Sequence, residues 1–177
     1  ECQEAIVAGG QPAIRELVQR AIADPGGVIN ALGEPKRAGA HILHRSSGLT
    51  ILHILWPPHH TQAPHNHLLW AEVGVYAGRE DNIFWRRCAP GATWQIEAIG
   101  AASVSTGGHV SLPQDAIHSV NNPLDRVTAG LHVYGGDLNA PRRSMWDLEA
   151  LAEVPLDLAR DLRAVDAYNA TVEHERQ

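Results

Sequence analysis

The sequence predicts a mainly β fold, a compact antiparallel barrel that carries a helix at each end of the chain. Between residues 41 and 137, short segments rich in Val, Ile, Trp and Thr alternate with turns rich in Gly, Pro and Asn, which is typical of a β-sandwich or barrel. Outside this region the apolar residues recur at helical spacing. At 177 residues, we expect a single domain over residues 1–177, with the barrel core at about 40–147.

Each end of the chain has a helical pattern. Residues 12–23 place Ile14, Val18 and Ile22 on one face, and the DPGG that follows is expected to end this helix. Residues 155–175 carry a broader apolar stripe and predict a second helix.

The central region predicts a series of short strands. In chain order they are LTILHILW, AEVGVYAG, NIFWRR, TWQIEAIG, HVSLP, IHSVNN and RVTAGLHVYGG. The charged stretch GRED before NIFWRR is interpreted as an exposed turn.

Composition excludes several classes of function. A net charge of −6, a pI near 6.0 and the absence of a basic run argue against nucleic acid and against an anionic membrane surface as partners. No apolar run approaches the roughly 20 residues of a membrane span, and the start of the sequence lacks the residue order of a signal peptide. The charge balance therefore favours a small-molecule partner. Cys2 and Cys88 have no metal-type spacing and cannot form a disulfide framework, so we expect a reduced, cytoplasmic protein. A homodimer is left open.

Four of the eleven histidines lie within nine residues, at 59–67. His65 and His67 are two residues apart, so on a strand their side chains leave the same face and can reach one ion. Neutral imidazole suits Fe, Zn, Cu or Ni. The alternative is a solvated polar loop, which we favour for His59 and His60 because two prolines precede them.

A third ligand has to come from elsewhere in the barrel, and His109 and His118 are the candidates. Spacing favours His118, since it lies in the series Gly107, Pro113, His118, Asn122. Together with His65, His67, Glu72 and Gly78, this series resembles the two-part signature of the cupin superfamily. Asp115 in place of a glycine, and one residue fewer before Gly78, depart from that signature.

Within the cupins, residues 40–147 most resemble the thiol dioxygenases, the group of cysteine dioxygenase and 3-mercaptopropionate dioxygenase. The likeness lies in Trp56, nine residues before His65, in HNHLLWAEVGVYAGRE and in LHVYGGD. It implies a cupin double-stranded β-helix in which His65, His67 and His118 bind one Fe(II) per chain. It further implies that His132 and Tyr134 line the oxygen pocket, and that a small thiol and O2 react to a sulfinate.

The chain also departs from this group. Glu72 is a fourth candidate ligand that thiol dioxygenases generally lack, and Gly130 replaces a serine two residues before His132. The group's carboxylate-binding Arg or Gln falls near Ala40 or His41, neither of which can form a two-pronged clamp. The candidates for contacting substrate are therefore Arg45, Arg79, His41 and Trp56.

Two other classes of function stay open. Glu72 favours a different metal-dependent cupin, such as a dioxygenase with three His and one Glu, a decarboxylase or an isomerase. The third hypothesis is a barrel that binds a small molecule without turnover.

Overall fold

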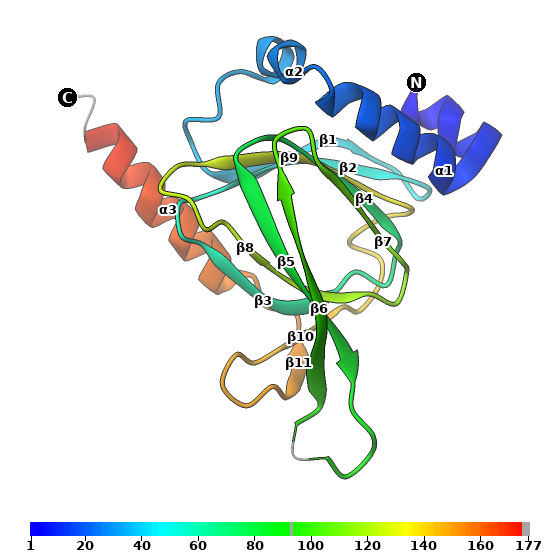
Figure 1. Cartoon of the computed structure of the whole chain (residues 1–177), viewed down its shortest axis with the longest axis vertical. Helices are drawn as coiled ribbons and strands as arrows, with labels where there is room; N and C mark the ends of the chain where they lie inside the picture. The colour runs from blue at the N-terminus through cyan, green and yellow to red at the C-terminus, as the bar shows by residue number, and fades with distance from the viewer. Residues whose placement is uncertain (93, 175–177) are drawn as a thin grey trace.

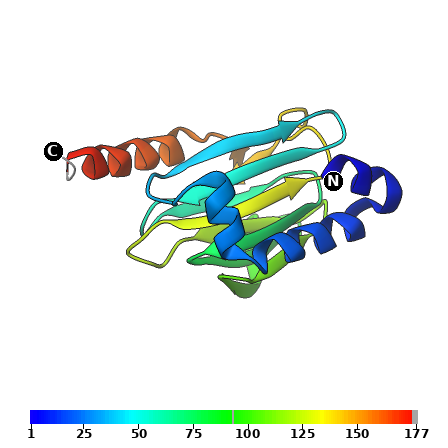
Figure 2. The same ribbon diagram turned by 90° about the horizontal axis from the view of Figure 1, so that it is seen from above.

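The chain folds into two antiparallel sheets that face each other and close into a jelly-roll barrel, as the sequence predicts (Figure 1). The computed structural model describes residues 1–92 and 94–174. Among these, the strand order is β1-β2-β9-β4-β7 in one sheet and β11-β10-β3-β8-β5-β6 in the other. Helices α1 and α2 lie outside the first sheet, and α3 runs along the side of the barrel (Figures 1 and 2).

The elements have the following bounds. The helices are α1 (Cys2–Ile22), α2 (Pro25–Leu32) and α3 (Ala159–His174). The strands are β1 (Gly39–Arg45), β2 (Thr50–Trp56), β3 (Thr61–Asn66), β4 (Ala71–Ala77), β5 (Arg79–Arg87), β6 (Ile96–Ser105), β7 (His109–Leu112), β8 (Ile117–Asn121), β9 (Thr128–Tyr134), β10 (Ser144–Trp146) and β11 (Glu153–Pro155).

Helix α1 contains the predicted helix but begins earlier. Its backbone is kinked at Gly10, where φ is 61°, and Pro12 follows. Ile14, Val18 and Ile22 are buried, as their spacing indicates. Because Gly74 of β4 has no side chain, α1 packs directly on the sheet, and a Cβ there would come within 2.6 Å of Val18.

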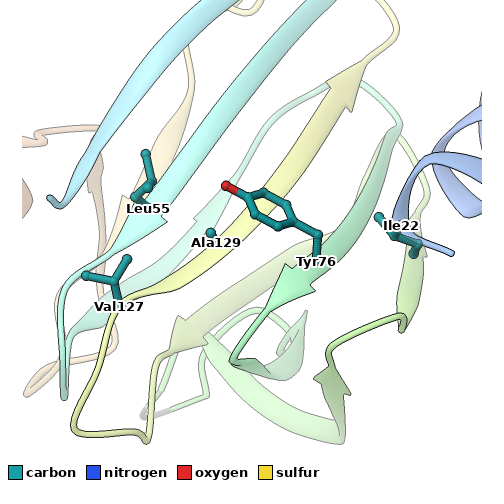
Figure 3. Close-up of a cluster of buried hydrophobic side chains, with 5 residues drawn as sticks. All are labelled: Ile22, Leu55, Tyr76, Val127 and Ala129. Carbon is teal, nitrogen blue, oxygen red and sulfur yellow. The ribbon is translucent and has the colours of Figure 1, made fainter. Parts of the chain in front are cut away.

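The expectation that DPGG only ends a helix was incomplete, because this segment also begins one. Asp24 accepts a hydrogen bond from the backbone N–H of Gly27, and Pro25 occupies the first turn of α2. An aspartate cap followed by proline is a helix start signal. A buried cluster of Ile22, Leu55, Tyr76, Val127 and Ala129 then joins the end of α1 to the outer face of the sheet (Figure 3).

The prediction of an exposed turn in the charged segment GRED is wrong, because most of this segment belongs to β5. Strand β5 begins at Arg79, and Glu80 and Asn82 are buried while Asp81 and Ile83 are not. Side chains alternate across a strand, so Glu80 and Asn82 lie on the inner face. The turn before β5 is made by Gly78, whose φ is 87°.

Helix α3 confirms the C-terminal prediction with a later start. Residues 153–155 form β11 instead, and residue 175 of the predicted helix lies outside the described residues. No residue of α3 is fully buried. Within the described chain, no helix has the length and apolar character needed to cross a membrane.

Candidate metal centre

Three histidines converge inside the barrel because of strand register. His65 of β3 and His118 of β8 are directly paired across the six-stranded sheet, so both side chains leave the same face. His67 follows two residues after His65, just past the end of β3, and Leu68 then turns the chain with a φ of 56°. All three side chains are buried.

The ligand atoms of the three rings lie close together. One nitrogen from each histidine fits in a group within 4.8 Å of one another. The Nε2 atom of His67 is 3.1 Å from Nε2 of His65 and 3.5 Å from Nε2 of His118. At a metal–nitrogen distance of about 2.1 Å, two ligands are about 3.0 Å apart at right angles and about 3.4 Å apart in a tetrahedral site. The observed spacing therefore fits a shared cation.

Neighbouring groups fix which nitrogen of His65 and His118 carries the proton. Nδ1 of His65 donates to the carbonyl of Ala63, at 2.9 Å. For His118, the amide of Asn82 decides the tautomer: its NH2 group donates to the Glu80 carboxylate at 3.1 Å, so its oxygen faces Nδ1 of His118 at 2.7 Å. A carboxylate can only accept, so the amide orientation is determined.

The Nε2 atoms of His65 and His118 are consequently unprotonated, and each directs a lone pair toward Nε2 of His67. Nε2 of His67 can donate one proton, so it can satisfy one of these lone pairs and leaves the other facing it. A cation satisfies all three imidazoles at once. Hydrogen bonds on the far side of ligand histidines also orient the rings. The residues present thus fit a metal ion.

Burial keeps the cluster neutral, which is the form that binds metals. It lowers the pKa of His65 to about 4 and lowers the pKa of His67 and His118 well below the usual value for histidine. A neutral ligand set without a carboxylate leaves the full charge on a bound ion.

The metal-free protein is expected to lose stability as the pH falls below about 6.5, the ordinary pKa of histidine. The folded-state pKa values are lowered, so the unfolded chain takes up protons first. Each histidine then costs up to about 1.4 kcal/mol per pH unit, until for His65 the folded form also protonates near pH 4. The free energy of urea unfolding of chelator-treated protein at pH 7, 6 and 5 measures this slope.

Two variants control this measurement. His65→Gln removes one titrating group and should flatten the slope. His59→Asn changes an exposed histidine, at a positive φ that asparagine tolerates, and should leave the slope unchanged. Equal slopes for wild type and His65→Gln would contradict the account.

The opposite sheet contributes His132 and Tyr134, from neighbouring inward positions of β9. The Tyr134 hydroxyl is 3.5 Å from Nδ1 of His132, and its ring packs edge-on against His67 with centroids 4.9 Å apart. Burial, together with the charge of Glu80, raises the pKa of Tyr134. Tyr134 is therefore a hydrogen-bond donor at neutral pH.

Glu80 connects the two sides of the site, and sequence reasoning missed it. It accepts from Nε1 of Trp56 at 2.8 Å and lies 3.4 Å from Nε2 of His132. Burial alone would raise the pKa of Glu80, but His132 and the hydrogen bonds from Trp56 and Asn82 lower it to about 2. Gly130 leaves room for the His132 ring, since a Cβ there would be 3.2 Å from Nε2 of His132.

A cavity of about 370 Å³ opens onto the cluster. Its lining includes the three histidines, His132 and Tyr134. It also includes Arg143, a half-buried residue that sequence reasoning missed because it lies in the loop after β9. Burial lowers the pKa of Arg143, and across the described residues no carboxylate lies within ion-pair distance of it.

Of the four candidates for contacting substrate, two line the cavity and two do not. Trp56 and Arg45 line the cavity, but the guanidinium of Arg45 forms a two-pronged pair with Asp137 at 2.7 and 3.0 Å. Arg79 pairs with Asp81 in the same way and does not line the cavity, so the structure does not bring this candidate to the site. His41 is exposed and also does not line the cavity.

Glu72, the candidate for a fourth ligand, does not reach the cluster. It lies on the outer face of β4, where its carboxylate accepts from Gln11 at 2.8 Å and Ser111 at 2.7 Å. His109, the rejected candidate for third ligand, is 2.5 Å from the same carboxylate. Ala71 and Val73 pack inward with Tyr134, and side-chain alternation turns Glu72 outward.

The other two histidines of the 59–67 stretch differ from each other. His59 is exposed, as a polar loop predicts. His60 is buried: it stacks on Trp56 with ring centroids 5.5 Å apart and pairs with Asp161 of α3 at 2.9 Å.

No family model matches the sequence. Among solved structures, the barrel is similar to an RmlC-like cupin family protein with a double-stranded β-helix fold from Methanocaldococcus jannaschii, at 14% identity and a TM-score of 0.47 over 58% of this chain and 84% of that one. A DMSP lyase from Ruegeria pomeroyi gives 18% identity and a TM-score of 0.47, over 62% of this chain and 51% of that one. An oxalate decarboxylase from Bacillus subtilis gives 16% and 0.41, over 52% and 22%.

The architecture is thus a barrel of two antiparallel sheets with flanking helices, and its cavity holds a three-histidine cluster that fits a metal ion. At these identities and TM-scores, no activity carries over from the similar structures. The reaction has to be inferred from the cavity itself.

Proposed function

We propose that this chain is an iron-dependent dioxygenase that oxidises a small thiol bearing a carboxylate to its sulfinate. The observation that carries the proposal is the set of three buried, neutral imidazoles in one cavity with Tyr134 and Arg143. The resemblance of the HxH and LHVY segments to thiol dioxygenases supports the choice of Fe(II), one ion per chain, held by His65, His67 and His118.

The reaction is RSH + O2 → RSO2H, in which sulfur loses four electrons and both oxygen atoms of O2 end on it. Iron bound by three neutral ligands would supply a site of undiminished charge that favours a thiolate and brings the thiol and O2 together. The protein residues then have to orient the substrate and exclude water.

Tyr134 and His132 are assigned to hydrogen bonding at the reacting end. The raised pKa of Tyr134, which follows from its burial, keeps its hydroxyl protonated and able to donate to an oxygen atom of substrate or product. His132 is placed by Glu80 on one side and faces the hydroxyl of Tyr134 on the other. We assign His132 and Glu80 to positioning Tyr134.

Charge in the cavity favours a mercapto-carboxylate over an amino thiol. Among the described residues that line the cavity, Arg143 is the cation without an acidic partner, and a guanidinium can bind a carboxylate with two parallel hydrogen bonds. Among the described residues that line the cavity, Asp161 is the one acid, and it is paired with His60. An ammonium group would therefore find no free partner there.

Oxygen consumption of the iron-loaded protein tests this proposal. With a mercapto-carboxylate such as 3-mercaptopropionate, we expect one O2 consumed per thiol and a sulfinate product detectable by mass spectrometry. Cysteamine, which has an ammonium and no carboxylate, is the matched comparison and should react much more slowly. If oxygen uptake stays at the level of free iron across a panel of mercapto-carboxylates, the proposal is wrong.

A further inference from the structure

Helix α3 turns an apolar face toward the cavity. Leu158 just before the helix, and Leu162 and Val165 within it, are spaced as neighbours on one helix face, and all three line the cavity. Leu162 is nevertheless 61% exposed and Leu158 37% exposed. These side chains thus border the cavity and its mouth without being covered by the protein.

Polar contacts hold α3 in this position. The Asn169 side chain bonds both the N–H and the carbonyl of Ala38, at 2.9 and 3.0 Å. Asp161 pairs with His60 at the other end of the helix, at 2.9 Å. Tyr168 adds packing against the cluster of Figure 3. The helix is therefore anchored near both ends, while Leu158 and Leu162 remain exposed beside the cavity.

The strands also contribute apolar side chains to the cavity lining. These are Leu52 and Ile54 of β2, Val120 of β8 and Ile42 of β1, which is 60% exposed. The cavity lining therefore combines two kinds of side chain. The histidines, Tyr134 and Arg143 are polar, and a second set is aliphatic. We call this second set the aliphatic chamber: Ile42, Leu52, Ile54, Val120, Leu158, Leu162 and Val165.

The size of the cavity matters as well. Its volume of about 370 Å³ is within the range that encloses drug-sized ligands, roughly 300–1,000 Å³. A three-carbon mercapto acid bound through its sulfur and its carboxylate has no further apolar group to place against the aliphatic side chains of the lining. The aliphatic chamber then contributes nothing to binding, although each buried methylene group is expected to tighten binding about fourfold.

We propose that the substrate carries an apolar body, an aliphatic or aryl group of at least about three carbons beyond the thiol and carboxylate, and that the aliphatic chamber binds this group. The inference rests on the proposed function for the thiol end of the molecule. It concerns specificity, and it can fail while the proposed reaction stands.

Two thiols with the same spacing between sulfur and carboxylate test it, namely 3-mercaptopropionate and 3-mercaptohexanoate. Binding to iron-loaded protein under nitrogen is measured by calorimetry, and KM and kcat are measured by oxygen uptake. We expect 3-mercaptohexanoate to bind more than about tenfold tighter, with a correspondingly lower KM, because it buries three more carbons. Its binding should also show a more negative heat-capacity change.

Leu162→Asp places a charge at the mouth of the aliphatic chamber on an exposed helix face, so the fold should tolerate it. This variant should lose the tenfold preference for the longer thiol and keep its affinity for 3-mercaptopropionate. Ala167→Asp introduces the same charge at an exposed α3 residue that does not line the cavity, and should keep the preference.

The two possible failures are distinguishable. Equal affinity for both thiols, or tighter binding of 3-mercaptopropionate, overturns the aliphatic chamber as a substrate site. Tighter binding of 3-mercaptohexanoate without any oxygen uptake supports the chamber and refutes the proposed reaction. A preference that survives Leu162→Asp places the apolar group elsewhere and also overturns the inference.

Discussion

Replacing His118 with alanine is expected to weaken metal binding by more than about 100-fold and to reduce thiol oxidation to the background of free iron. His118 supplies one of three ligands, and its ring is held in place by Asn82 at 2.7 Å. Loss of groups that merely orient ligands typically costs 10- to 100-fold in affinity, so loss of a ligand should cost more. Metal content after dialysis, and titration with Co(II) as a spectroscopic probe, measure the effect.

The matched control removes a histidine outside the cluster. His109 was the other candidate for third ligand in the sequence, yet its ring contacts Glu72 on the outer face of the barrel. His109→Gln should retain one metal ion per chain. If His109→Gln loses the metal and His118→Ala keeps it, the assignment of the cluster is wrong.

Arg143→Leu is expected to raise KM for mercapto-carboxylates about 10- to 100-fold and to affect kcat less. A charge-assisted hydrogen bond contributes about 1.5–3 kcal/mol, and Arg143 is the cavity cation without an acidic partner among the described residues. Oxidation of a thiol without a carboxylate should respond little. Steady-state oxygen uptake with the two kinds of thiol separates these effects.

Arg142 provides the control, since it is the neighbouring arginine, is exposed and does not line the cavity. Arg142→Leu should leave KM within about twofold of wild type, because exposed charges of this kind contribute little. An equal loss for charged and uncharged thiols in Arg143→Leu would mean that the variant disturbs the fold or the metal, and that Arg143 is not the carboxylate partner.

The fold and the three-histidine cluster could be predicted because they follow local rules. The i, i+2 spacing of His65 and His67 signals one strand face, and the spacing around His118 selects it over His109. The apolar stripe of Ile14 and Val18 equally predicts a buried helix face. Each of these patterns lies within a short stretch of sequence, so it can be recognised without knowledge of the tertiary fold.

Other features of the site depend on which face of a strand a side chain occupies, or on contacts between residues far apart in the sequence. Glu72 lies one position away from the inward-facing Ala71 and Val73, so an uncertainty of one residue in the loop before β4 decides whether it faces the cavity. Glu80 and Asn82 were hidden in a charged stretch, although their two-residue spacing with Phe84 is a strand signal. If this spacing had been given more weight than the charge, it would have identified Glu80 and Asn82 as residues on the inner face of a strand.

Arg143 carries no comparable signal. It lies in an irregular loop after the last barrel strand, beside a second arginine of the same type. What distinguishes Arg143 from Arg142 is burial against the cavity, and burial of loop residues follows from the tertiary path of the chain. Arg45 and Arg79 were reasonable candidates, but each already has an aspartate partner.

The location of a bound metal ion tests the central claim most directly. Crystals grown with Fe(II) or Co(II), with diffraction recorded on either side of the metal absorption edge, should show one anomalous peak per chain within about 2.1 Å of Nε2 of His65, His67 and His118. An ion bound elsewhere, or protein that takes up no transition metal at this cluster, would contradict the claim.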